Sequence, residues 1–165
     1  MLQAFFRMIT KIEHKSFQNV HTVRKKRNEE NMNPVKVRNV EIGTGKPKII
    51  VPIVAKTKEE IAEQAKKLND IPCDVVEWRV DWYDDVFDTE KVIETLKMLR
   101  EILGEMPILM TFRTSKEGGE KAIDPKDYAA LNIAAARSGY ADLIDVEIFT
   151  GDDIVSEIIE GAHKA

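Results

Sequence analysis

The chain repeats one pattern four times between residues 49 and 165: a short apolar run, then a longer amphipathic segment. The apolar runs begin near residues 49, 75, 107 and 141. Helix-start signals fall between them, including a capping box at Thr57 and Glu60 and an Asp124-Pro125 pair typical of a first helical turn. This alternation is typical of a parallel sheet with helical crossovers. The sequence therefore predicts an α/β fold containing four βα units.

Ahead of the first unit, residues 35–42 alternate apolar and polar side chains, as a half-exposed strand does. A Gly43-Thr44-Gly45 turn follows, so we expect a β-hairpin that joins residues 35–42 to the run beginning at residue 49. Gly45-Lys46 is not read as a phosphate loop, because the required glycine spacing and a following helix are missing.

Four βα units can belong to either of two architectures, an open doubly wound sheet or a closed barrel. A doubly wound sheet usually places a glycine-rich turn after its first strand, but here that turn is Ala55-Lys56-Thr57-Lys58. Polar side chains instead follow several strands, which favours a (β/α)8 barrel, the TIM barrel architecture. Such a barrel needs about 250 residues. We therefore expect residues 32–165 to be the amino-terminal half of a barrel domain.

Residues 1–31 differ from the rest in charge. They hold seven of the 25 basic residues and three of the 29 acidic ones, which leaves 18 basic and 26 acidic residues in 32–165. The apolar start is interrupted by Arg7 and Lys11, and no small-residue cleavage site follows. We expect an extraneous or disordered basic extension, with Met32 as the natural initiator. A transit or membrane-surface segment is the alternative.

The acidic body gives no electrostatic footprint for nucleic acid, and no apolar run is long enough to span a membrane. The single cysteine, Cys73, cannot form an internal disulfide, which fits the reducing cytoplasm. We interpret Cys73 as an ordinary core or turn residue.

Charged side chains follow two runs that otherwise read as buried strands. Glu77 and Arg79 lie two residues apart, so they point to one face, the interior of a barrel. Arg113 ends the next strand, and Glu117 lies in the loop above it. We expect one carboxylate between two guanidiniums, with arginine donors left for hydroxyl or carboxylate oxygens. An ion-pair network that merely fills the barrel is the alternative.

Other candidates carry weaker signals. Asp145 and Glu147 repeat the two-residue spacing and are interpreted as an acidic inner layer. Lys56 stands where a Schiff-base lysine could stand, but we favour its interpretation as a solvated loop lysine. No pair among His14, His21 and His163 has metal-ligand spacing, so we predict no metal.

Four motifs occur together, in order and at matching intervals: residues 37–51 (VRNVEIGTGKPKIIV), Glu77-x-Arg79-x-Asp81, residues 111–119 (TFRTSKEGG) and Asp145-x-Glu147. In this combination residues 33–165 resemble type I 3-dehydroquinate dehydratase.

The resemblance implies a (β/α)8 barrel of the shikimate pathway, usually dimeric, that converts 3-dehydroquinate to 3-dehydroshikimate by loss of water. In the family a lysine forms an imine with the substrate ketone, and a histidine moves the proton; no metal or organic cofactor is used. Glu77, Arg79 and Arg113 match residues that hold substrate oxygens. Glu117 matches a carboxylate that orients the catalytic histidine.

The resemblance also indicates what residues 1–165 lack. The family's histidine, imine lysine and carboxylate-binding arginine match positions beyond Ala165. His163 and Lys164 lie on the amino-terminal side of the expected fifth strand, which is the end of the barrel away from the catalytic site. Pro52 stands where many relatives have a small polar residue. We therefore expect this chain alone to be inactive. The alternatives are a non-catalytic half-barrel that binds a small polyol acid or a partner chain, and another Schiff-base enzyme that uses Lys56.

Overall fold

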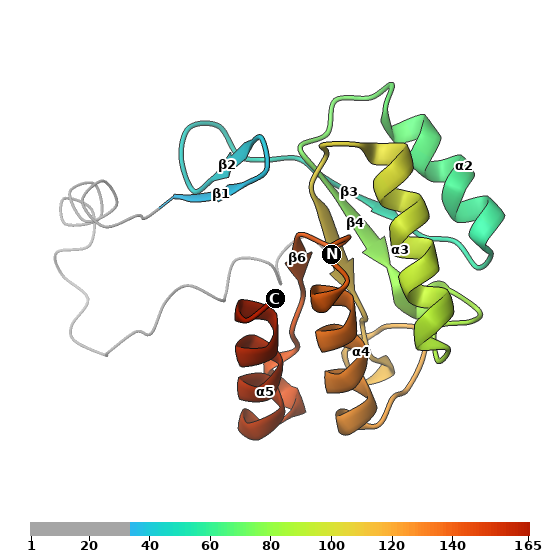
Figure 1. The fold of residues 1–165 in the computed structure, drawn as a ribbon, viewed down its shortest axis with the longest axis vertical. Coiled ribbons are helices and arrows are strands. Elements are labelled where there is room, and N and C mark those ends of the chain that lie inside the picture. The colour runs from blue at the N-terminus through green and yellow to red at the C-terminus, as the bar shows by residue number, and fades with distance from the viewer. Residues whose placement is uncertain (1–33) are drawn as a thin grey trace, which may run out of the picture. The chain divides into compact units, whose positions relative to one another are not determined.

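The computed structural model describes residues 34–165, so the expectations for residues 1–31 lie outside it (Figure 1). An antiparallel hairpin precedes a four-stranded sheet with four helices. The strands are β1 (Val35–Val37), β2 (Val40–Ile42), β3 (Ile50–Ile53), β4 (Val75–Arg79), β5 (Ile108–Thr111) and β6 (Leu143–Ile144). The α-helices are α2 (Lys58–Leu68), α3 (Thr89–Leu103), α4 (Pro125–Arg137) and α5 (Asp152–His163).

The sheet confirms the four predicted βα units. Its strands are parallel and follow the order β3-β4-β5-β6, so each strand pairs with the next one along the chain. The register sets Glu77 opposite Pro52 on one side and Leu109 on the other. Sequential parallel pairing through helices, without a change of direction, is the order found in a (β/α)8 barrel.

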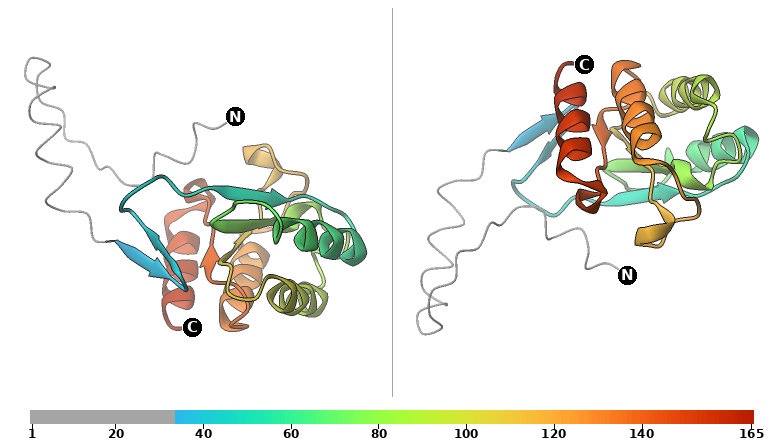
Figure 2. Two further views of the ribbon diagram at one scale, coloured as in Figure 1. Left: turned by 90° about the horizontal axis from the view of Figure 1, so that it is seen from above. Right: turned by 90° about the horizontal axis from the view of Figure 1, so that it is seen from below.

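The core lies between the sheet and the helices, which gather on one face of the sheet (Figure 2). Val76 and Trp78 of β4 and Met110 of β5 are fully buried against this helical layer. Because side chains alternate along a strand, Glu77 and Arg79 lie on the opposite face, as the sequence predicted.

Side-chain caps fix where α2, α3 and α4 begin, at the carboxyl edge of the sheet. Thr57 and Glu60 form the predicted capping box of α2. Asp88 accepts hydrogen bonds from the first turn of α3, and Asp124 precedes Pro125 in α4 as predicted. Within residues 34–165, no helix has both the length and the apolar character needed to span a bilayer.

The hairpin differs from the one predicted. Residues 35–42 fold back on themselves, because β1 pairs with β2 through a turn at Arg38-Asn39. Residues 43–49 then form an irregular connection, and β2 does not pair with β3. Arg38 has a φ of 52°, in the left-handed region that favours glycine or asparagine, so the sequence carried no ordinary signal for this turn.

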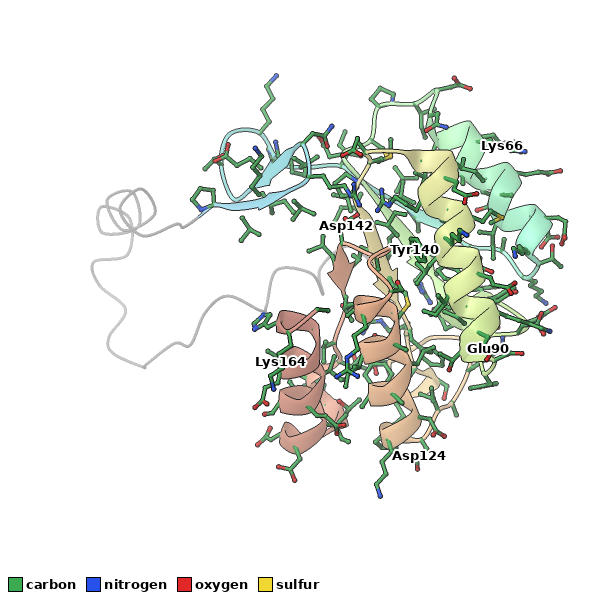
Figure 3. All side chains as sticks on the ribbon, in the orientation of Figure 1. Lys66, Glu90, Asp124, Tyr140, Asp142 and Lys164 are labelled. Atoms are coloured by element: carbon green, nitrogen blue, oxygen red, sulfur yellow. The ribbon has the colours of Figure 1, made fainter. Side chains whose placement is uncertain are left out.

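Asp142 holds the hairpin to the amino edge of the sheet, where Figure 3 labels it. Its carboxylate accepts hydrogen bonds from Arg38 Nε at 2.5 Å, from Arg100 Nη2 and from the Ile108 N–H at 2.8 Å. Burial lowers the pKa of Arg100 despite this partner. The tie to Asp142 offsets the backbone strain at Arg38 and explains where the hairpin turns.

The fourth strand is much shorter than the predicted residues 141–149. Only Leu143–Ile144 pairs as a strand, and residues 148–150 form a 3-10 turn. The Glu147 N–H donates to the hydroxyl of Tyr128, 3.1 Å away, instead of to a neighbouring strand. Strand pairing therefore ends where the polar side chains of residues 145 and 147 begin to bind the loop after β5.

Candidate active site at the carboxyl edge of the sheet

The candidate site lies where β4, β5 and β6 end, on the face away from the helices. Figure 3 labels Glu90 and Asp124, at the starts of α3 and α4, at the end of the molecule opposite Asp142. The strands run toward that end, so Arg79 and Arg113 follow β4 and β5 to the same edge. This is the edge at which parallel α/β folds place their ligand sites.

Arg113 lies among three carboxylates. Its Nη1 is 3.1 Å from Glu117 and 3.1 Å from Glu147, and its Nη2 is 2.7 Å from Asp145. Burial opposes the charge of Arg113, but the three carboxylates outweigh it and raise the pKa of the guanidinium. Arg113 is therefore charged and fixed in direction.

Arg79 makes a bidentate ion pair with Asp81, which is fully buried. Its Nε and Nη2 donate to the two carboxylate oxygens at 2.8 and 2.7 Å. These hydrogen bonds raise the pKa of Arg79. A 3-10 turn at Val80–Trp82 brings Asp81 beside Arg79 only two residues after it.

The prediction that one carboxylate lies between the two guanidiniums is therefore wrong. Each arginine has its own acidic partners, and Glu77 forms no ion pair with any residue of 34–165. Glu77 is near enough to raise the pKa of Arg79 by its charge. The two-residue spacing correctly predicted that Glu77 and Arg79 share one face of the sheet. It did not predict that Asp81 is the ion-pair partner of Arg79.

The site contains more acidic groups than basic ones. Burial raises the pKa of Asp145, and repulsion from Glu77, Glu147 and Glu117 adds to this against the attraction of Arg113. Burial likewise raises the pKa of Tyr128, whose hydroxyl donates to the Asp145 carbonyl oxygen at 3.2 Å. Within residues 34–165, the candidate site therefore carries more negative than positive charge.

The raised pKa of Asp145 predicts a pH dependence of stability. The folded chain holds this proton more tightly than the unfolded chain, so stability falls as pH rises from about 4 through the raised pKa. An Asp145→Asn variant should lack this loss, and its Tm relative to the unaltered chain should rise between acidic and neutral pH. Thermal melts by circular dichroism across this range would measure it.

Asp70→Asn is the matched control for this measurement, because Asp70 is exposed and its side chain has no hydrogen-bond partner in residues 34–165. Its Tm difference from the unaltered chain should stay constant with pH. A constant difference for Asp145→Asn as well would contradict the assignment.

The other candidates lie as follows. Lys56 is exposed at the end of β3, and Pro52 faces the same side as Glu77. His163 closes α5 and Lys164 lies 3.5 Å from Glu160, so neither contacts the arginines. In residues 34–165, no group of three or more His, Cys, Asp and Glu side chains is arranged to hold a metal ion.

A hollow of about 290 Å³ lies beside the loop after β5. Its lining includes Thr114, Glu117, Tyr128, Glu147 and Phe149. Glu77, Arg79 and Arg113 do not line it. Two carboxylates that pair with Arg113, those of Glu117 and Glu147, do.

Comparison with known proteins identifies the family. The profile of "Type I 3-dehydroquinase" matches residues 49–165. The chain belongs to the type I 3-dehydroquinase family. It is 53% identical over 129 residues to the 3-dehydroquinate dehydratase of Clostridium botulinum (strain Eklund 17B / Type B), covering 78% of this chain and 51% of that protein. It is 48% identical over 132 residues to the Escherichia coli O1:K1 / APEC enzyme of the same name, covering 80% and 52%.

Solved structures of the family share the fold. The type I 3-dehydroquinate dehydratase of Clostridium difficile, solved with covalently modified comenic acid, superposes with a TM-score of 0.79 at 45% identity. The match covers 80% of this chain and 52% of that one. The Enterococcus faecalis 3-dehydroquinate dehydratase gives 0.76 at 44%, covering 79% and 55%. The chain therefore has the expected barrel-type α/β fold and spans about half the length of its relatives.

Proposed function

We propose that residues 34–165 form the part of a 3-dehydroquinate dehydratase that holds the hydroxyl-bearing side of 3-dehydroquinate. The observation that carries this proposal is the pair of fixed guanidiniums, Arg79 and Arg113, together with the carboxylate of Glu77, which forms no ion pair within residues 34–165. The relatives named 3-dehydroquinate dehydratase support the choice of substrate.

The guanidiniums have donors to spare. A guanidinium carries five N–H groups. Within residues 34–165, the side chain of Arg113 uses three of them and that of Arg79 uses two. The remaining N–H groups can donate to substrate oxygens, and Glu77 can accept from a substrate hydroxyl. Together these groups bind alternating donors and acceptors, which is what a polyol presents.

The charge of the site indicates which part of the substrate it holds. Five carboxylates (Glu77, Asp81, Glu117, Asp145 and Glu147) stand against two guanidiniums at this edge. A substrate carboxylate would be repelled here, whereas hydroxyl and ketone oxygens would not. The substrate carboxylate is therefore proposed to bind outside residues 34–165.

In the mechanism that the resemblance implies, the loss of water uses an imine-forming amine and a proton-transfer group. His163 is the only histidine of residues 34–165, and it lies at the end of α5. We propose that the catalytic histidine and lysine are supplied from outside this range, and that Glu117 orients that histidine. On this basis the 165-residue chain alone catalyses no dehydration and needs no cofactor. The whole enzyme is proposed to be a cytoplasmic homodimer; the unpaired Cys73 supports the compartment.

Titration of 3-dehydroquinate into the 165-residue chain, followed by NMR, tests the binding half of the proposal. Arg113→Lys should weaken binding by roughly tenfold, because lysine keeps the charge but lacks the planar fork of donors. Arg137→Ala is the matched control, since Arg137 is exposed on α4 and makes no side-chain hydrogen bond within residues 34–165. Equal affinity of both variants would contradict the site.

The catalytic half is tested by ultraviolet absorbance of the conjugated product. The chain alone should give none, and substantial turnover would refute the proposal. Adding the other half of the Clostridium botulinum relative as a separate polypeptide should restore dehydration. Binding of 3-dehydroquinate without any restored turnover would favour a non-catalytic binding module instead.

A further inference from the structure

The loop formed by residues 113–120 extends beyond the sheet that supports it. The last ladder pairs are Arg79 with Thr111 and Met110 with Ile144. After these pairs β4 turns into the 3-10 segment at Val80, and β6 ends. The N–H groups of Arg113, Thr114 and Glu120 therefore have no carbonyl of a neighbouring strand to receive them, and buried N–H groups need a partner. Other N–H groups of the loop bond within it or to its end, as the Ser115 N–H does to the Lys121 carbonyl oxygen at 2.9 Å.

Two buried carboxylates take the place of the missing ladder. On the β4 side, Asp81 Oδ1 accepts from the Arg113 N–H at 3.3 Å and Oδ2 from the Glu120 N–H at 3.1 Å. On the β6 side, Glu147 Oε1 accepts from the Thr114 N–H at 2.8 Å and Oε2 from the Thr114 hydroxyl at 2.7 Å. Asp81 is 0% exposed and Glu147 is 3% exposed.

Each of these carboxylates also binds one site arginine. Asp81 holds both Nε and Nη2 of Arg79, and Glu147 holds Nη1 of Arg113. The direction of each guanidinium is thereby linked to the path of the 113–120 loop. Glu117 lies on the same loop, 3.1 Å from Arg113 Nη1.

We propose that Asp81 and Glu147 are positioning residues that hold the 113–120 loop and both site arginines in one arrangement before any ligand binds. Neither needs to touch the substrate. A site whose donors are already fixed binds without the entropic cost of ordering them. The ligand part of this inference rests on the proposed function, whereas the clamp on the loop does not.

Residue-by-residue amide hydrogen exchange of the full 165-residue chain, measured by NMR, tests the clamp. Asp81→Asn should speed exchange at Arg113 and Glu120 by roughly 10- to 100-fold and leave Thr114 unchanged. Glu147→Gln should speed exchange at Thr114 by a similar factor and leave Glu120 unchanged. A carboxylate that served only global stability would change all three amides together, which would overturn the inference.

Asp85→Asn and Glu157→Gln are matched controls, because both side chains are exposed and neither contacts the loop. They should leave the three amides as they are. Should a clamp variant fail to fold, the unaltered chain still decides the matter. Through-hydrogen-bond NMR couplings should join the Thr114 amide to the Glu147 carboxyl carbon and the Glu120 amide to that of Asp81. Their absence in the folded chain would overturn the inference.

Titration of 3-dehydroquinate separates the inference from the proposed function. Each clamp variant should bind it about tenfold more weakly than its control does, because its arginine is no longer fixed. If the exchange pattern holds but no form of the chain binds 3-dehydroquinate, the clamp stands and the proposed function fails. If the unaltered chain binds and both clamp variants bind equally well, the positioning role is overturned and the function stands.

Discussion

Replacing Asp142 with alanine should lower the free energy of unfolding by about 3 kcal/mol. The substitution removes the shared acceptor of Arg38, Arg100 and the Ile108 N–H. The Arg100 side chain is only 14% exposed, so its charge would stay partly buried without its carboxylate, and the N–H of Ile108 would lose its partner. Urea denaturation followed by circular dichroism would measure the loss.

Glu105→Ala is the control, because Glu105 also pairs with Arg38, at 3.3 Å, but is 78% exposed. Exposed ion pairs contribute little, so this variant should be nearly as stable as the unaltered chain. If the two variants lose the same stability, Asp142 is not the point at which the hairpin is held.

Gly119→Ala should have the second large effect, a loss of about 2–3 kcal/mol together with displacement of the 113–120 loop. A Cβ at this position would lie 1.7 Å from the carbonyl oxygen of Arg113, which no side-chain rotation can relieve. The Gly119 N–H also donates to Thr114 at 2.8 Å, so the two ends of the loop are in backbone contact. The same denaturation experiment, with NMR signals of the loop, would show both changes.

Gly118→Ala is the matched control one residue earlier. Gly118 has a φ of 86°, which costs an alanine about 1–2 kcal/mol, but its added Cβ would meet open space. It should therefore lose less stability than Gly119→Ala and keep the loop signals in place. Equal losses, with the loop unchanged in both, would show that backbone contact at Gly119 is not the constraint.

Much of the fold could be predicted from local signals. The capping box at Thr57 and the Asp124-Pro125 start are encoded within one helical turn, and both were confirmed. The hairpin turn was not predictable in this way, because the left-handed backbone of Arg38 depends on Asp142, 104 residues away. The predicted strand 141–149 was too long for a similar reason, since Glu147 is engaged by Thr114 and Tyr128.

The cluster of charged side chains at the carboxyl edge was predictable in its location but not in its pairing. Alternation along β4 placed Glu77 and Arg79 on one face, which depends only on the backbone. Which carboxylate meets which guanidinium depends on the 3-10 turn that returns Asp81 to Arg79. No pattern in the sequence marks that turn. The hydrogen bonds of Glu147 could not be predicted either, because its partners come from the loop after a different strand.

The bond between Arg38 and Asp142 also has a consequence for the order of folding. It closes a segment of 104 residues that contains three complete βα units. During synthesis the hairpin leaves the ribosome before the four βα units, yet its anchor is made only after the third crossover helix has followed. The hairpin is thus secured only after β3, β4 and β5 and their helices have been made, and until then the amino edge of the growing sheet lacks this contact.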